Sequence, residues 1–145
     1  MTQINIVRNN IVKESPRLKE KLYVRLLRVS EEHSESLQLR AIKETNASTE
    51  VFRMIKEPTK DVQRIAIEMN QVNIIYCDTD VQKEYLKMIP FLITYFFIAS
   101  NELLLTCLEA QWSRSFYERF IEKYPRDKEF QREFNRLKLI KGPLV

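Results

Sequence analysis

Few residues of this chain have the types and spacing that acid–base or metal chemistry requires. The sequence holds one histidine, His33, and two cysteines, Cys77 and Cys107. A structural zinc site takes about four cysteine or histidine ligands at close spacing, so no metal is expected, and Cys107 is interpreted as a small buried thiol. His33 stands in a Glu-Glu-His-Ser-Glu run, which is typical of a solvated loop. Asp78 and Asp80 are better explained as helix caps than as an acid–base pair.

The glycine content excludes the common phosphate-binding and nucleophile motifs. The chain contains a single glycine, Gly142, whereas dinucleotide-binding loops, P-loops and nucleophile elbows each need more than one. Glycine-dependent hairpin turns are missing for the same reason. The sequence therefore predicts an all-α protein that is not an enzyme and that binds no cofactor.

Basic residues give the main indication of an anionic partner. The net charge is +3 over residues 1–49, −3 over residues 50–112 and +4 over residues 113–145. The candidate residues form two sets. The four residues of the N-terminal set, and Lys128, Arg132 and Arg136 of the C-terminal set, recur at near-helical spacing, so a helix would place each of these groups on one face. The N-terminal basic stripe comprises Arg17, Lys21, Arg25 and Arg28. The C-terminal basic stripe comprises Arg114, Lys123, Arg126, Lys128, Arg132 and Arg136. Either stripe could neutralise nucleic-acid phosphates, although interleaved Glu129 and Glu133 favour a solvated, ion-paired face.

Aromatic residues are concentrated after residue 84, and most of them are expected in the core. Stacking on nucleic-acid bases would require exposed rings beside an arginine. Trp112, Arg114 and Tyr117 are the one local set that satisfies this requirement, and they stay a candidate for base stacking.

Five short stretches of the sequence are similar to one another. They begin at Leu37, Val62, Val81, Leu103 and Phe130, so successive starts are 25, 19, 22 and 27 residues apart. The first four share apolar or small residues at their first, fifth and sixth positions. A recurring unit of this size indicates stacked helical elements. The alternative is an irregular bundle of amphipathic helices that resemble one another by chance.

Cap residues and prolines mark where the helices begin. Ser15 and Pro16 predict an N-terminal helix that ends near Ser30. Comparable groups at residues 58–61, 78–80, 100–102 and 125–127 open the later helices. The second and third stretches are each followed by a further short helix, and the last helix should turn Phe130, Phe134 and Leu137 inward.

The most apolar segment, residues 89–99, reads IPFLITYFFIA. It has about half the length that a membrane-spanning helix requires. We therefore expect a buried helix at the centre of the stack and no membrane span.

Residues 58–70 read PTKDVQRIAIEMN: a proline, a polar cap, an acidic-Val-Gln turn, apolar residues and an asparagine. This string resembles the short units of HEAT-like and leucine-rich-repeat-variant proteins. The resemblance extends over residues 36–110, although Ile89 and Pro90 stand where asparagine is typical and Leu104 stands where glutamine is typical. It implies a curved α-solenoid that binds a macromolecule, and it brings no catalytic residue to this chain.

These observations lead to one interpretation of the domain. We expect residues 1–145 to form a single helical-repeat domain, a short α-solenoid of about four to five units, with a capping helix region at 1–35 and a capping helix at 125–145. No signal peptide is visible near Met1, which favours a reducing, cytoplasmic setting. Ala66→Glu should unfold the array, because it would place an unpaired charge at a stacked interface.

The functional expectation follows from the same pattern. A helical-repeat protein without catalytic motifs is expected to bind a partner protein, as an adaptor or inhibitor. The alternative is a nucleic-acid-binding module that uses the two basic stripes.

Overall fold

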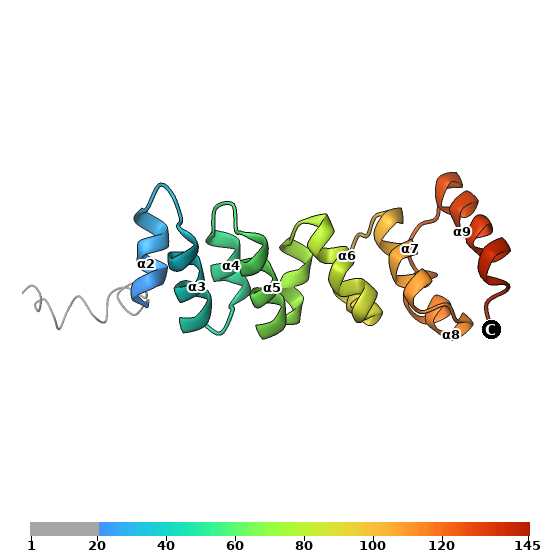
Figure 1. The fold of residues 1–145 in the computed structure, drawn as a ribbon, viewed down its shortest axis with the longest axis horizontal. Helices are drawn as coiled ribbons and strands as arrows, with labels where there is room; N and C mark the ends of the chain where they lie inside the picture. Colours follow the sequence, from blue (N-terminus) through green and yellow to red (C-terminus); the bar gives the residue numbers. More distant parts are fainter. Residues whose placement is uncertain (1–20) are drawn as a thin grey trace, which may run out of the picture. The chain divides into compact units, whose positions relative to one another are not determined.

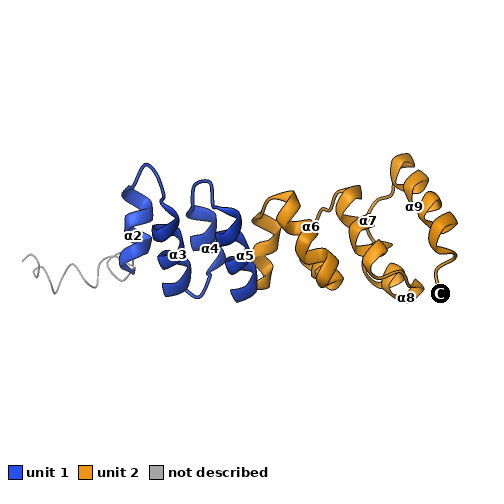
Figure 2. Cartoon of the chain, viewed as in Figure 1, with its two compact units in different colours: residues 1–70 blue, residues 71–145 orange. Residues whose placement is uncertain are grey.

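The computed structural model describes residues 21–145, and all regular structure within that range is helical (Figure 1). This confirms the prediction of an all-α protein. The chain divides into two compact units, residues 1–70 and residues 71–145 (Figure 2). Each unit is described by itself below, the first from residue 21 onward. Arg17 and the predicted helix start at Ser15 and Pro16 lie outside the described residues.

From residue 21 onward, unit 1 contains four short helices: α2 (Leu22–Val29), α3 (Glu35–Glu44), α4 (Thr49–Met54) and α5 (Lys60–Met69). Side-chain hydroxyls fix where two of them begin, because the Ser34 Oγ accepts from the Leu37 N–H and the Thr59 Oγ1 accepts from the Val62 N–H, each at 3.2 Å. The core of the unit is made by Val24, Leu27, Ala41, Ile42, Phe52, Val62, Ala66 and Ile67.

Unit 2 alternates α-helices with tighter or wider helical turns. Its elements are η2 (Gln71–Tyr76), α6 (Thr79–Met88), η3 (Pro90–Tyr95), α7 (Asn101–Ala110), α8 (Arg114–Phe116), η4 (Tyr117–Ile121) and α9 (Lys128–Lys141). The η2 and η3 elements are 3₁₀ helices, and η4 is a π-helical turn. The lone glycine, Gly142, ends α9 with a φ of 84°, a conformation that L side chains adopt at a cost. As expected, α9 turns Phe130, Phe134 and Leu137 inward.

Helices α3, α5, α6 and α7 share one pattern of length, N-cap position and burial. Each has ten residues, and each N-cap stands three residues before the start of the corresponding sequence stretch. The N-caps are Ser34, Thr59, Asp78 and Ser100. The second, fifth and sixth residues of each stretch are buried in all four helices. The spacing seen in the sequence is therefore the spacing of these helices' N3 positions.

The second position holds a buried glutamine in three of these helices. The carboxamides of Gln38, Gln63 and Gln82 each donate to a backbone carbonyl that precedes their own helix, at 2.8–3.0 Å. The Gln38 Oε1 also accepts from the Thr59 N–H at 3.2 Å, which ties α3 to the cap of α5. In α7 this position is Leu104, which is fully buried.

The prediction of a buried helix over residues 89–99 holds only for the first part of the segment, where Leu92 and Ile93 are buried. The segment forms a 3₁₀ helix that ends at Tyr95, and the side chains of Phe97 and Ile98 are then 95% and 80% exposed. Pro90 removes a backbone donor at the first turn, and 3₁₀ geometry rarely persists for more than a few residues. High apolarity alone therefore did not bury the end of this segment.

Candidate functional site

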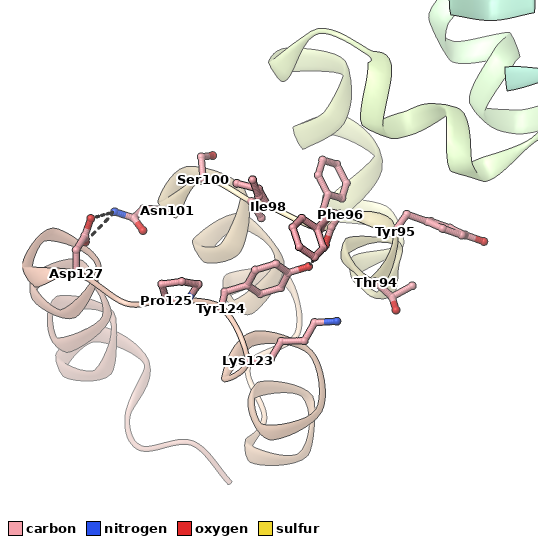
Figure 3. A pocket seen from close by; sticks show the side chains of 12 residues that line it. Thr94, Tyr95, Phe96, Ile98, Ser100, Asn101, Lys123, Tyr124, Pro125 and Asp127 are labelled. Carbon is pink, nitrogen blue, oxygen red and sulfur yellow. Dashed lines mark hydrogen bonds between the residues drawn. The ribbon is translucent and has the colours of Figure 1, made fainter. Parts of the chain in front are cut away.

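The site is built from connectors, a name we give to the segments that join the end of one helical element to the N-cap of the next α-helix. In unit 2, the connectors at residues 96–100 and 122–127 lie beside one another and enclose an open cleft of about 1030 Å³ (Figure 3). Most of its wall is apolar, and Tyr95, Phe96, Phe97, Ile98, Tyr124 and Pro125 contribute to it.

Tyr124 holds the base of the cleft together. Its side chain is buried, and its hydroxyl lies within hydrogen-bond distance of the Ile93 carbonyl, at 2.9 Å, and of the Phe96 carbonyl. Burial, and to a smaller extent the neighbouring Cys107, raises the pKa of Tyr124, so the hydroxyl keeps the proton that it donates. The start of the 96–100 connector is thus fixed to the 122–127 connector.

Asp127 and Asn101 close one end of the cleft. The Asn101 Nδ2 donates to the two Asp127 carboxylate oxygens at 3.0 and 3.2 Å (Figure 3). The same carboxylate caps α9 by accepting from the Phe130 N–H at 2.8 Å. The bond from Phe130, followed by the bond from Asn101, lowers the pKa of Asp127, so this carboxylate is ionised and already has donors.

Lys123 is the basic residue of the cleft. Its side chain is exposed, and its Nζ lies 5.4 Å from the centre of the Tyr124 ring, a distance typical of a cation–π contact. It belongs to the C-terminal basic stripe proposed from the sequence, and no other member of that stripe lines the cleft.

The remaining members of the C-terminal basic stripe have varied surroundings. The Arg126 guanidinium donates to the Tyr117 hydroxyl, and the Arg136 Nε pairs with Glu133 at 2.9 Å. Three further members, Arg114, Lys128 and Arg132, are exposed. Lys128, Arg132 and Arg136 recur every fourth residue along α9, so they share its solvent face.

The N-terminal basic stripe is described only in part, since Arg17 lies outside the described residues. Lys21, Arg25 and Arg28 are exposed along α2. Lys21 and Arg28 border a small hollow of about 200 Å³ in unit 1, together with Glu50. An acidic residue therefore lies beside this stripe.

The aromatic set suggested for base stacking is used inside unit 2. The Tyr117 ring is buried and stacks on Phe134, with centroids 5.2 Å apart and an interplanar angle of 13°. The Trp112 Nε1 donates to the Gly142 carbonyl at 3.1 Å. Tyr117 is therefore not available as a base-stacking ring, and these rings contact α9 instead.

His33 lies in a loop with exposed neighbours, as expected, but its own side chain is half-buried and has a structural role in unit 1. Its Nδ1 accepts from the Lys56 N–H at 2.9 Å, which leaves the Nε2 to donate to the Leu27 carbonyl at 2.9 Å. The Lys56 Nζ donates in turn to the carbonyls of Ser30 and Glu31 at 3.2 and 3.3 Å. These bonds join the 30–34 connector to the 55–59 connector.

The described residues show little that is suited to catalysis. Between residues 21 and 145, no group of three or more His, Cys, Asp or Glu side chains is placed to hold a metal ion. Both cysteines are free thiols, and burial raises the pKa of each to about 12, which disfavours the reactive thiolate. No helix in this range is long and apolar enough to cross a membrane.

Comparison with known proteins gives no family: no family model, curated protein or solved structure matches the chain. Function must therefore be inferred from the chain's own surface. Sequence reasoning missed the cleft, because its two walls are connectors that lie far apart in the sequence. The sequence contained one indication of the cleft: two large apolar residues, Phe97 and Ile98, stand side by side just before the Ser100 cap.

Proposed function

We propose that this chain is a non-enzymatic helical-repeat protein that binds a partner protein through the cleft of unit 2. The observation that carries the proposal is the exposure of Phe97 and Ile98, at 95% and 80%, on the rim of a mainly apolar cleft. Exposed apolar patches that border a concavity are typical of protein-interaction sites, where aromatic anchors supply much of the binding free energy.

The proposal includes a stacked, solenoid-like arrangement of the ten-residue helices within each unit. Neighbouring helices are linked near their N-termini. In unit 1, the Thr59 Oγ1 donates to Glu35 at 2.6 Å. In unit 2, Lys83 pairs with Glu102 at 2.7 Å, and Asn101 bonds to Asp127. An α-solenoid would give a radius of gyration well above the roughly 15 Å of a globule of this length in small-angle scattering, whereas a compact irregular bundle would give a value close to it.

Affinity capture from an extract of the source cells tests the function. The baits are the full chain, the variant Phe97→Lys/Ile98→Glu, and the control variant Leu139→Lys/Ile140→Glu. The control removes exposed apolar side chains of α9 (89% and 67% exposed) that do not line the cleft. We expect a protein that the parent and the control retain and that the connector variant loses. Equal recovery with all three baits would contradict the proposal.

The nucleic-acid function remains a second candidate because Lys128, Arg132 and Arg136 share an exposed face of α9. Binding of mixed-sequence DNA and RNA to the full chain at low and at physiological salt tests it. A phosphate-binding face predicts affinity that falls steeply with salt and is lost on charge reversal of these residues. Absence of binding at low salt would remove this candidate.

A further inference from the structure

The chemistry of the cleft also indicates what kind of segment occupies it. Resting on the proposed function, we propose that the occupant is a linear segment of a partner protein that carries a large apolar side chain and a nearby carboxylate. The apolar side chain lies against Phe97, Ile98 and Tyr124, and the carboxylate pairs with the Lys123 ammonium.

The charge of the cleft follows from two residues of opposite sign. The Asp127 carboxylate already accepts from Asn101 and from the Phe130 N–H, so its charge is largely compensated by donors of the chain itself. The Lys123 Nζ is exposed and lies beside the Tyr124 ring, which cannot neutralise it. A partner that enters the cleft therefore meets a cation on an apolar wall, and a carboxylate is its complement.

The backbone of the rim favours a linear segment over a preformed helix face. Within residues 21–145, no hydrogen bond engages the backbone N–H or C=O groups of Phe97, Ile98 or Ala99. An extended peptide can satisfy such groups with its own main chain while its side chains enter the cleft. A helix presents no free main-chain groups along its length and would leave them unpaired.

The same charge argument disfavours a second copy of this chain as the occupant. Several of the more exposed apolar residues outside the cleft lie next to basic residues. Leu139 and Ile140 stand between Lys138 and Lys141, and Val29 follows Arg28. Docking any of these segments would bring like charges toward Lys123.

Selection of random linear peptides from a display library on the full chain tests the inference. We expect the selected peptides to combine an aromatic or leucine anchor with Asp or Glu. The best peptide is then synthesised together with a version in which its acidic residue is replaced by lysine. Fluorescence anisotropy gives the dissociation constants of both peptides for the parent chain and its variants.

Lys123→Glu is the decisive variant, and Lys141→Glu is its control, since Lys141 is exposed and lies outside the cleft. We expect Lys123→Glu to weaken binding of the acidic peptide at least about fivefold and to strengthen binding of the lysine version. Lys141→Glu should leave both dissociation constants within about twofold of the parent values. Selected peptides without an acidic residue, or an unchanged affinity in Lys123→Glu, would overturn the inference.

Two further outcomes separate this inference from the proposed function. If peptides bind and Phe97→Lys/Ile98→Glu abolishes their binding, but charge has no effect, the cleft is a docking site and the acidic occupant is wrong. If the selected peptides bind the connector variant as well as the parent, the cleft itself is wrong as the site. A concentration-dependent dimer that the connector variant loses would identify a second copy as the occupant and overturn the inference.

Discussion

The 55–59 connector of unit 1 and the 96–100 connector of unit 2 begin and end alike. Ile55 and Phe96 are both buried, and their N–H groups donate to carbonyls three residues back at 3.1 and 3.0 Å. Both connectors end at an N-cap, Thr59 or Ser100, whose hydroxyl accepts from the third residue of the following helix at 3.2 Å. They have the same length, so they can be compared residue by residue.

The middles of the two connectors differ in chemistry. Lys56 and Glu57 in unit 1 correspond to Phe97 and Ile98 in unit 2. Lys56 is tied by its backbone to His33 and by its side chain to Ser30. The backbone also differs at the third residue, because Glu57 has a φ of 50° whereas Ile98 keeps a negative φ, as expected since a β-branched residue is strained at positive φ.

The difference between the two connectors shows which features the fold requires and which it only tolerates at these positions. A connector of this length can be held by hydrogen bonds to the chain's own polar groups, as the 55–59 connector is held by the bonds of His33 and Lys56. Unit 2 instead leaves an apolar cleft and two exposed apolar side chains at the corresponding positions. Because the Phe97 and Ile98 side chains are exposed, the core of unit 2 does not require them to be apolar, and this is why we propose the cleft as a binding site.

The largest expected effect is that of a substitution at a buried position that the ten-residue helices share, because the comparison of the two units depends on this shared pattern. Ala66 of α5 and Cys107 of α7 occupy the same register position and are both fully buried. Ala66→Glu should lower the free energy of unfolding by about 4 kcal/mol or more, because it buries an unpaired carboxylate. Guanidinium denaturation followed by far-UV circular dichroism measures this. If the variant unfolds at the same guanidinium concentration as the parent, the proposed alignment of the helices is wrong.

The next effect tests Gln38, whose carboxamide oxygen accepts from the N-cap residue of α5. Gln38→Leu introduces the residue that α7 has at this position and removes the bonds to the His33 carbonyl and the Thr59 N–H. We expect a loss of about 1–3 kcal/mol in the free energy of unfolding, because two part-buried backbone groups lose their partners.

Gln131→Leu is the matched control for Gln38→Leu. Gln131 has the same position in α9 but is exposed, so its replacement should change the free energy of unfolding by less than about 0.5 kcal/mol. Equal effects of the two substitutions would contradict the role assigned to Gln38.

Alkaline pH should destabilise unit 2 through its thiols. Burial raises the pKa of Cys107 from 9.0 to about 12, and burial followed by the Asp78 charge raises that of Cys77 to about 12. Each thiol therefore ionises first in the unfolded chain. Their contribution to stability is complete below pH 9.0 and is lost as the pH rises toward about 12, by at most about 1.4 kcal/mol per pH unit for each group. Cys107→Ala should flatten this slope in urea titrations, and an unchanged slope would contradict the assignment.

Tyr124→Phe should have a smaller effect. It removes the hydroxyl that bonds to the Ile93 and Phe96 carbonyls, and we expect a loss of about 1 kcal/mol in the free energy of unfolding. Tyr95→Phe is the control, because the Tyr95 hydroxyl makes only a long, exposed contact of 3.5 Å with Gln71. Thermal melting compares the two variants, and a larger loss in Tyr95→Phe would be inconsistent with Tyr124 as the support of the cleft.

Local chemistry made much of the helix pattern predictable. Cap residues such as Thr59, Ser100 and Asp127 act on the backbone three residues ahead, so helix starts could be read from the sequence. The apolar positions of the ten-residue helices could be read for the same reason.

What depended on tertiary contacts was not predictable. Residues 89–99 looked like a buried helix, because apolarity does not reveal whether a neighbouring element covers a side chain. His33 looked solvated, because its two partners, Leu27 and Lys56, come from different segments. The cleft was missed for the same reason, since the 96–100 and 122–127 connectors meet only in the folded unit.

The most direct test of the central claim compares Phe97→Lys/Ile98→Glu with the parent in stability and in binding. The variant gives unit 2 the residues that unit 1 has at these positions. Because both side chains are exposed, we expect the free energy of unfolding to change by less than about 0.5 kcal/mol. Loss of two apolar anchors should weaken binding of the partner or selected peptide by about thirtyfold or more in fluorescence anisotropy. Unchanged affinity in a folded variant would contradict the assignment of the cleft to partner binding.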